Sequence, residues 1–382
     1  MQRTPGPRCV PAASPGPHRP LRKRLGGRLA TALALVSVVA VAACGHASTP
    51  VSQARNSSLP DRCPVGRLLV PACGAWWGAS VEPTDGESQV DAVRAFERRI
   101  GRTLPVVHLY HVGGDVFPTR QELELVADRA HPRVLFFNWR PEGSLTWAEV
   151  AAGGPVVDGR IDRLARHLRA TLRQPFFLSI TAEPEDEVDP TPGSGHTAAD
   201  YRRMFRHVVQ RLRADGVRNA VTVMDYIAIE KWVEQPWFGQ LYPGNDVVDW
   251  LGLDAYLRQS SDAKADFAAL VHGPRGSVPG WPGFLAWAGM VAPGKPVMLG
   301  EWGAITDRAH DGLKVDLLRA FADTAPELPQ IKAYVYWSSA RPLPVDGGSG
   351  TGDTRIDESD ATVRAFVAAV DRPWFSRVTP NP

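Results

Sequence analysis

The sequence is poor in cysteine and has no excess of charge of either sign. Its 43 Lys and Arg residues nearly balance its 41 Asp and Glu residues, which leaves a formal net charge of +2 over 382 residues. A chain this balanced lacks the basic surface that binding to a polyanion requires, so nucleic acid is not an expected partner. Its hydrophobic share of 44% nonetheless suffices for one large buried core.

Long apolar runs are also scarce, and the one near the N-terminus, residues 29–43, is short for a bilayer span. It follows a cluster of basic residues at positions 22–28, an order typical of a secretory signal peptide. The run ends in the residues Val-Ala-Ala-Cys-Gly at 41–45, which resemble a bacterial lipobox. We therefore expect residues 1–43 to be a cleaved signal peptide and Cys44 to be lipidated.

This N-terminal pattern predicts an exported protein that its lipid on Cys44 anchors to the outer face of the bacterial cell membrane. The alternative is a plain signal with a chance cysteine, and the protein is then secreted. Polar residues 44–65 are expected to form a flexible tether, residues 66–376 one large domain, and residues 377–382 a tail. A monomer is expected.

Two cysteines, Cys63 and Cys73, follow Cys44 in the exported part. An even pair in an oxidising compartment predicts a disulfide between them. Two buried free thiols are the alternative.

Short apolar, β-rich runs alternate with segments of helical period through the large domain. In residues 161–172 and 201–212, apolar side chains recur at helical spacing, as expected for helices that pack one face on a sheet. Eight β-rich runs are present: Leu68–Ser80, Pro105–Val112, Arg133–Arg140, Pro175–Thr181, Ala220–Ile227, Val247–Tyr256, Pro296–Gly303 and Ile331–Ser338. They predict an α/β fold, a single (β/α)8 TIM barrel. An open doubly wound sheet is the alternative, but no Gly-rich phosphate loop follows the first run.

Catalytic groups of such barrels lie at the C-terminal ends of the strands, and two carboxylates stand out there. Glu183 follows the fourth run, and Glu301 lies near the end of the seventh. Two carboxyls held about 5–5.5 Å apart suit glycoside hydrolysis by double displacement. One attacks the anomeric carbon, while the other protonates the leaving oxygen and later activates water.

The sequence resembles glycoside hydrolase family 26, the β-mannanase family of the retaining barrel glycosidases, over about residues 74–370. The resemblance is carried by GAWWG at 74–78, WAEVAAGG at 147–154, AEP at 182–184, DWLGLDAY at 249–256 and GEWG at 300–303. It implies Glu183 as acid/base, Glu301 as nucleophile and Tyr256 as the phenol that orients the nucleophile. Asp254 is then expected to line the sugar site.

The fourth run departs from the family pattern. The family has a His directly before the acid/base and an Arg a few residues earlier, where this chain has Ala182 and Ser179. These family side chains help to position the sugar, so the departure bears on the substrate more than on the chemistry. We expect Glu183 to have a raised pKa, and Glu301 to be kept ionised by hydrogen-bond donors.

Further substrate contacts are expected from side chains near the strand ends. Sugar rings expose apolar C–H faces that stack on aromatic planes, and polar side chains can bind sugar hydroxyls. The expected stacking residues are Trp76, Trp77, Trp139, Trp302 and Trp337, and the expected hydrogen-bonding residues are His108, His111, Arg140 and Tyr226.

Together these patterns predict an exported retaining glycoside hydrolase that cleaves a β-linked polysaccharide or oligosaccharide, with β-mannan as the family default. Another β-glycan, such as β-1,3- or mixed-linked glucan or xylan, is one alternative. A lipid-anchored glycan-binding protein that has lost catalysis is the other. No cofactor and no metal are expected, because no ligand spacing of a known metal loop is present.

Overall fold

The structure is a computed structural model that describes residues 62–258, 262–273, 278–306, 311–345 and 350–380. Eight parallel strands close into a barrel in the order of the sequence, from β1 to β8, and β8 pairs with β1. The predicted TIM barrel is therefore confirmed. The expected signal peptide, the lipidation site Cys44 and most of the expected tether lie outside the described residues.

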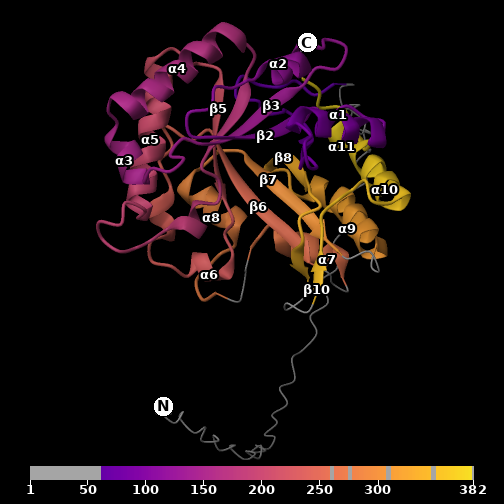
Figure 1. Ribbon diagram of the computed structural model, residues 1–382. Coiled ribbons are helices and arrows are strands. Elements are labelled where there is room, and N and C mark those ends of the chain that lie inside the picture. The colour runs from indigo at the N-terminus through magenta and orange to yellow at the C-terminus, as the bar shows by residue number, and fades with distance from the viewer. Residues whose placement is uncertain (1–61, 259–261, 274–277, 307–310, 346–349, 381–382) are drawn as a thin grey trace, which may run out of the picture. The chain divides into compact units, whose positions relative to one another are not determined.

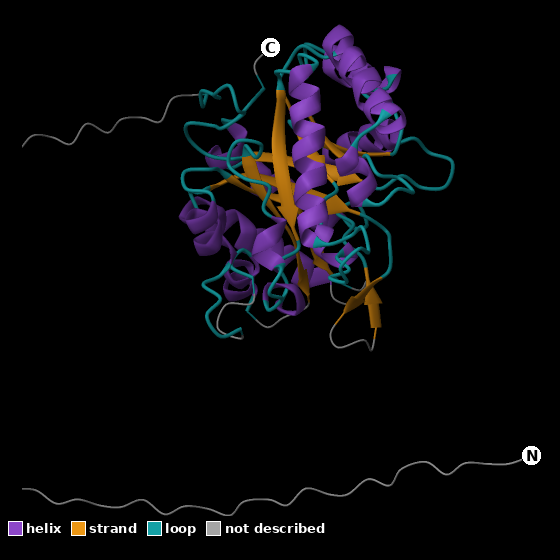
Figure 2. Ribbon diagram, turned by 90° about the vertical axis from the view of Figure 1, so that its left-hand side faces the viewer, coloured by secondary structure: helices purple, strands orange, loops and turns teal. Residues whose placement is uncertain are grey.

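The barrel strands coincide with the eight β-rich runs of the sequence. They are β1 (Trp76–Val81), β2 (Val106–Val112), β3 (Val134–Arg140), β4 (Phe176–Ile180), β5 (Ala220–Tyr226), β6 (Trp250–Arg258), β7 (Val297–Ile305) and β8 (Ile331–Ser338). Two short strands, β9 (Leu343–Val345) and β10 (Gly350–Gly352), form a separate antiparallel pair beside the barrel (Figure 2).

Helices surround the barrel, with α3, α4 and α5 on one side of the strands and α9 and α10 on the other (Figure 1). The α-helices are α1 (Gln89–Ile100), α2 (Arg120–Ala127), α3 (Trp147–Ala152), α4 (Pro155–Thr171), α5 (Ala198–Ala214), α6 (Glu230–Val233), α7 (Ala263–Leu270), α8 (Phe284–Val291), α9 (Asp311–Thr324), α10 (Asp360–Val370) and α11 (Pro373–Ser376). Short 3-10 turns η1 (Pro184–Glu187), η2 (Phe238–Leu241) and η4 (Ala325–Glu327) interrupt the loops. Among the described residues, no helix combines the length and the hydrophobicity that crossing a bilayer requires.

Helix α5 shows how local sequence sets these boundaries. It begins after Thr197, whose side chain accepts from the N–H of Asp200, while the Asp200 carboxyl accepts from the N–H of Thr197. This reciprocal capping satisfies backbone donors that the first turn of a helix leaves unpaired. The apolar stripe predicted at 201–212 is buried against the sheet and α3, as its helical period requires.

The hydrophobic core has two layers. The larger layer lies between the sheet and the helices, and the smaller layer fills the barrel interior toward the N-terminal ends of the strands. The smaller layer includes Trp76, Phe136, Phe177, Trp250 and Met298, all at most 1% exposed. These large side chains fill the barrel at the N-terminal ends of its strands. The space for a site inside the barrel therefore lies at the C-terminal ends of the strands.

A disulfide joins Cys63 and Cys73, the pair expected from the sequence. The segment that the disulfide closes packs against the smaller core layer. The N–H of Cys63 donates to the carbonyl of Arg377 at 2.9 Å. Val378 is also buried there, at 1% exposure. Cys63, from the expected tether, and residues 377 and 378, from the expected tail, thus pack together with the domain.

Candidate active site

Glu183 lies just beyond β4, on the turn that leads into η1. Its backbone is left-handed, with φ 53° and ψ 45°, and Thr181 before it also has a positive φ of 51°. Such values are rare for residues other than glycine and cluster at functional sites. The turn is tied to its neighbours, because the N–H of Glu183 donates to the carbonyl of Asp225 at 3.3 Å and Thr181 donates to the carbonyl of Trp139 at 2.9 Å.

Glu301 lies on β7 at a register irregularity, where it pairs with Asp254 of β6. Its two carboxylate oxygens accept from different tyrosines: Tyr110 donates to Oε1 at 2.7 Å and Tyr256 donates to Oε2 at 2.6 Å. The N–H of Glu301 donates to Oδ1 of Asp254 at 2.7 Å. Both the side chain and the backbone of Glu301 are therefore fixed, as a reacting carboxylate requires.

The surroundings of Glu183 and Glu301 have different effects on the pKa values of their carboxyls. Burial, followed by the charge of Glu301, raises the pKa of Glu183 well above its usual range. Burial also raises the pKa of Glu301, but the hydroxyls of Tyr256 and Tyr110 oppose that rise by stabilising the ionised form. Burial and the charge of Glu301 raise the pKa of both tyrosines, so each hydroxyl keeps the proton that it donates. The arrangement favours a protonated Glu183 facing an ionised Glu301.

A third acid, Asp225 at the end of β5, occupies the barrel interior beneath the pair. Its Oδ1 lies 1.4 Å from the position that a Cβ on Gly252 would take, and 2.4 Å from that of Gly300. Glycine at both positions therefore makes room for the carboxyl. Burial raises the pKa of Asp225 to about 7, and burial together with the charge of Asp225 raises that of Asp254 well above its usual range.

Two of the expected substrate contacts lie at the rim of this site. The half-buried Trp337, at the end of β8, meets the ring of Tyr256 edge to face with centroids 5.6 Å apart. The side chain of Arg140, at the end of β3, is 44% exposed and forms ion pairs with Glu142 and Glu187. Both side chains remain candidates for contact with a sugar.

The contacts expected from the other aromatic residues are wrong, because all five side chains are buried outside the site. Successive residues of a strand point to opposite faces, and an aromatic near a strand end therefore has an even chance of facing the helices. The rings of Trp77, Trp139, Tyr226 and Trp302 pack in the layer between sheet and helices, against Phe366, Phe117, Phe238 and Phe321 respectively. Trp76 instead lies in the smaller core layer inside the barrel, where its indole N–H donates to the carbonyl of Leu69.

Three polar predictions also need correction. His111 faces outward and stacks on Phe117 at 4.4 Å. His108 points into the barrel, but it is only 2% exposed and stacks on Phe136 at 3.9 Å, below the reach of a substrate. Burial lowers the pKa of His108 to about 3, so its ring is neutral. Asp254, expected to line the sugar site, is 1% exposed and holds the backbone of Glu301 instead.

Tyr110 and Asp225 were missed by the sequence reasoning. Tyr110 lies two residues after the inward-facing His108, so the alternation of β2 places it on the same face one step nearer the rim. Asp225 is the last inward-facing residue of β5, and its carboxyl takes space that a side chain at position 252 of β6 or 300 of β7 would fill, so glycine stands at both positions. The alternation of inward- and outward-facing side chains along β2 and β5 predicts both positions, once it is known which residues of each strand face the barrel interior.

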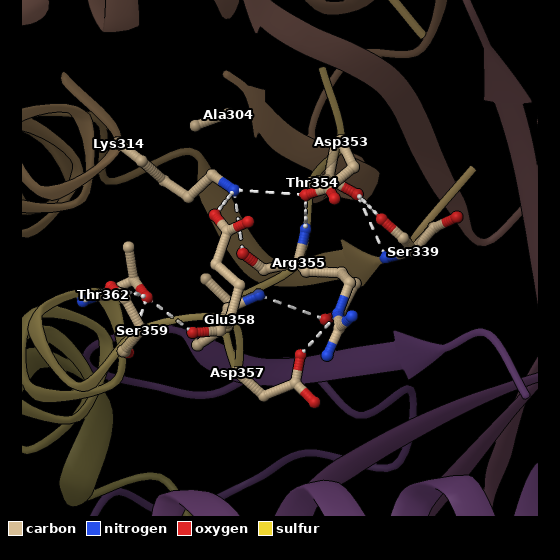
Figure 3. A network of polar contacts seen from close by, with 12 residues as sticks. Ala304, Lys314, Ser339, Asp353, Thr354, Arg355, Asp357, Glu358, Ser359 and Thr362 are labelled. Atoms are coloured by element: carbon tan, nitrogen blue, oxygen red, sulfur yellow. Dashed lines mark hydrogen bonds and ion pairs between the residues drawn. The ribbon is translucent and has the colours of Figure 1, made fainter. Parts of the chain in front are cut away.

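A polar network holds the segment before α10 against α9 and β7 (Figure 3). The fully buried Nζ of Lys314 donates to the carbonyl of Arg355 at 2.9 Å and forms ion pairs with Asp353 and Glu358. Next to it, Thr354 packs so closely on β7 that a Cβ on Gly303 would lie 2.8 Å from its methyl group. The same Cβ would lie 3.3 Å from the ring of Tyr256, so the network supports the wall behind that tyrosine.

Within the described residues, no group of three or more His, Cys, Asp or Glu side chains is arranged to hold a metal ion.

Comparison with known proteins points to one family. The model of glycosyl hydrolase family 26 matches residues 192–277. A β-1,3-xylanase of a Vibrio species is 37% identical over 102 residues, which are 27% of this chain and 21% of that protein. The chain thus spans about a fifth of the length of the curated relatives that it matches.

Solved structures share the fold. The catalytic domain of a family 26 endo-β-1,4-mannanase from Bacillus sp. JAMB-750 superposes with a TM-score of 0.51 at 14% identity, covering 80% of this chain and 91% of that one. A modular endo-β-1,4-mannanase from Cellulomonas fimi gives 0.51 at 18% identity, covering 80% and 73%. One stretch of this sequence thus matches glycoside hydrolase family 26, and its barrel shares the fold of the two mannanases.

Proposed function

We propose that this protein is an exported retaining glycoside hydrolase that cleaves a β-linked polysaccharide. One observation carries the proposal: Glu301 is held by two tyrosine hydroxyls, while the pKa of Glu183, across the barrel, is raised by burial and by the charge of Glu301. A protonated acid just after strand four and an ionised carboxylate on strand seven are the two groups that double displacement needs.

In the first step, the carboxylate of Glu301 attacks the anomeric carbon, and the glycosidic C–O bond breaks as Glu183 gives its proton to the leaving oxygen. A covalent glycosyl ester on Glu301 and a free sugar hydroxyl result. In the second step, Glu183, now ionised, takes a proton from water as the water attacks the same carbon. The ester bond breaks, and both carboxyls return to their starting states with the anomeric configuration retained.

Tyr110 and Tyr256 are proposed to orient Glu301 and to stabilise its charge before attack. Each donates to a different oxygen, so the carboxylate is fixed in plane as well as in position. Trp337 beside Tyr256 is proposed to stack on the sugar, and Arg140 to bind hydroxyls at the opposite rim. Asp254 acts through the backbone of Glu301 rather than on the sugar.

Two polysaccharides, β-mannan and β-1,3-xylan, are the leading candidates for the substrate. β-Mannan is the family default and the substrate named for the structural neighbours, whereas the curated relatives are named β-1,3-xylanases. Because the family's usual His is replaced by Ala182, β-1,3-xylan stands beside β-mannan as a candidate, with β-1,3- and mixed-linked glucan next.

A reducing-sugar assay on these polysaccharides tests the proposal. Turnover of one of them, abolished in the Glu301→Ala variant, is the expected result, and proton NMR of the first product should show the retained anomer. In the Glu183→Ala variant, an activated aryl glycoside should still form the intermediate and stall there, until azide releases it. If none of the polysaccharides is cleaved but one binds, the protein is a glycan-binding protein and the hydrolase proposal fails. An inverted product rejects Glu301 as the nucleophile.

We also propose that the enzyme acts at the cell surface, held by a lipid on Cys44. The lipobox-like residues 41–45 are the support for this proposal. A spacer of polar residues between Cys44 and the barrel is suited to give the cleft access to polymers outside the cell.

A further inference from the structure

The turn that carries Glu183 is unusual in its backbone. Of the four non-glycine residues with positive φ in the described part of the chain, Thr181 and Glu183 lie on this turn, and Ala228 lies on the loop after β5. Backbones in this region persist only where the surrounding structure holds them in place. The contacts between the turn and the loop after β5 therefore decide where the Glu183 carboxyl is placed.

One side chain joins these two segments, and it is Glu185, two residues after Glu183. Its Oε1 accepts from the N–H of Ile227 and from the N–H of Ala228, both at 3.1 Å. Glu185 is fully buried, and its Oε2 has no hydrogen-bond partner within the described residues. A buried carboxyl that bridges the turn to the loop fixes both left-handed backbones at once.

We propose that Glu185 is a positioning residue for Glu183: its buried carboxyl ties the turn after β4 to the loop after β5 and so holds the acid/base at the site. This inference rests on the proposed role of Glu183. Glu185 lies outside the AEP stretch at 182–184 and acts through the backbone, without contact with the sugar.

The groups that face Glu185 indicate the state in which it does this. Glu183 and Asp186 come from its own turn, Tyr201 from α5 and Tyr226 from β5, and none of them is a cation. Burial raises the pKa of Glu185 to about 8, so the carboxyl keeps its proton at neutral pH. A neutral carboxyl accepts through Oε1 as an amide oxygen does, and glutamine is therefore a close replacement.

The test compares Glu185→Gln with Glu185→Leu, which removes the acceptor. On a polysaccharide that the wild type cleaves, the leucine variant should lose about a hundredfold in kcat, with a KM close to that of the wild type, because a misplaced acid cannot protonate the leaving group. The glutamine variant should keep most of the activity. If the leucine variant does not fold, Glu185→Ala, which admits water to the two N–H groups, takes its place.

A second substrate separates positioning from general damage. The first-turnover burst of dinitrophenol from a 2,4-dinitrophenyl β-glycoside needs no proton from Glu183, so the leucine variant should release it at nearly the wild-type rate. Loss of both reactions to the same extent overturns the proposal, as does a glutamine variant as poor as the leucine variant. Glu97→Gln is the control for damage away from the site: Glu97 accepts from the N–H of Leu104 at 2.8 Å and pairs with Arg133 at 2.8 Å near the other end of the barrel, so its loss should leave both reactions at the wild-type rate.

A crystal structure of the leucine variant decides the question without turnover. We expect Glu183 to leave its left-handed conformation, and its unchanged position would overturn the proposal. If the wild type cleaves no polysaccharide and no aryl glycoside, the proposed function fails, while this structure still tells whether Glu185 holds the turn.

Discussion

The buried Asp225 offers a sharp test of how the site is charged. Its pKa of about 7 lies roughly three units above the ordinary value of 3.8. Each unit corresponds to about 1.4 kcal/mol, so ionising Asp225 in the folded protein costs about 4 kcal/mol more than in the unfolded chain. Asparagine has nearly the same shape and carries no charge, and Asp225→Asn should therefore remove this cost.

The sign of the effect follows from the raised pKa. Below about pH 4 the carboxyl is protonated in both the folded and the unfolded chain, and the variant should have nearly the stability of the wild type. As the pH rises from about 4 to about 7, the unfolded chain loses the proton before the folded chain does, and the wild type loses stability. Above about pH 7 the variant should be more stable than the wild type by up to about 4 kcal/mol.

Urea unfolding of both proteins, with the disulfide kept oxidised, measures this difference across the pH range. The control is Asp246→Asn, where a hydrogen bond from Arg206 lowers the pKa of an exposed carboxyl. That variant should be slightly less stable than the wild type at neutral pH, by about 0–1 kcal/mol, and equal to it in acid. A difference between Asp225→Asn and wild type that does not change with pH would refute the reasoning.

Three further outcomes are expected. Replacing Cys63 and Cys73 by serine should lower the free energy of unfolding by about 2–3 kcal/mol in urea titrations, because the disulfide closes a loop with a sequence separation of 10. Tyr256→Phe and Tyr110→Phe should each lower kcat/KM about 10- to 100-fold, since each removes one hydrogen bond to the charged Glu301; steady-state kinetics that show no loss in either variant would contradict its role. Mass spectrometry of the native protein should find a lipid on an N-terminal Cys44, and a mature chain that begins elsewhere without a lipid would reject the anchor.

The order and type of the barrel elements could be predicted from the sequence because they depend on near neighbours along the chain. The stripe at 201–212 becomes the buried face of α5, and each β-rich run contains a strand. The predicted start of the first strand differs from the observed one, because a disulfide holds the residues before it. The run from Leu68 was predicted as strand, but β1 begins only at Trp76, because the residues before it belong to the segment that the disulfide closes.

The site could be predicted in part. Glu183 lies just beyond β4 and Glu301 within β7, and Tyr256 donates to Glu301, as the family resemblance implied; its orienting role stays a prediction. The sequence alone does not show which of the other side chains point into the barrel and which face the helices. Trp139 and Trp302 face the helices, and the irregularity of β7 near Glu301 shifts which residues point inward.

The sequence by itself thus determined the eight strand and helix units and pointed to Glu183 beyond strand four and Glu301 on strand seven, because periodicity and turn chemistry are local. Tertiary structure alone decided which side chains meet. Tyr110 reaches Glu301 across 191 residues of sequence, and Asp225 fits beneath them only because β6 and β7 carry glycine at 252 and 300. Such contacts depend on how the barrel closes and on the register of each strand pair, and a shift of one residue would turn every side chain to the other face.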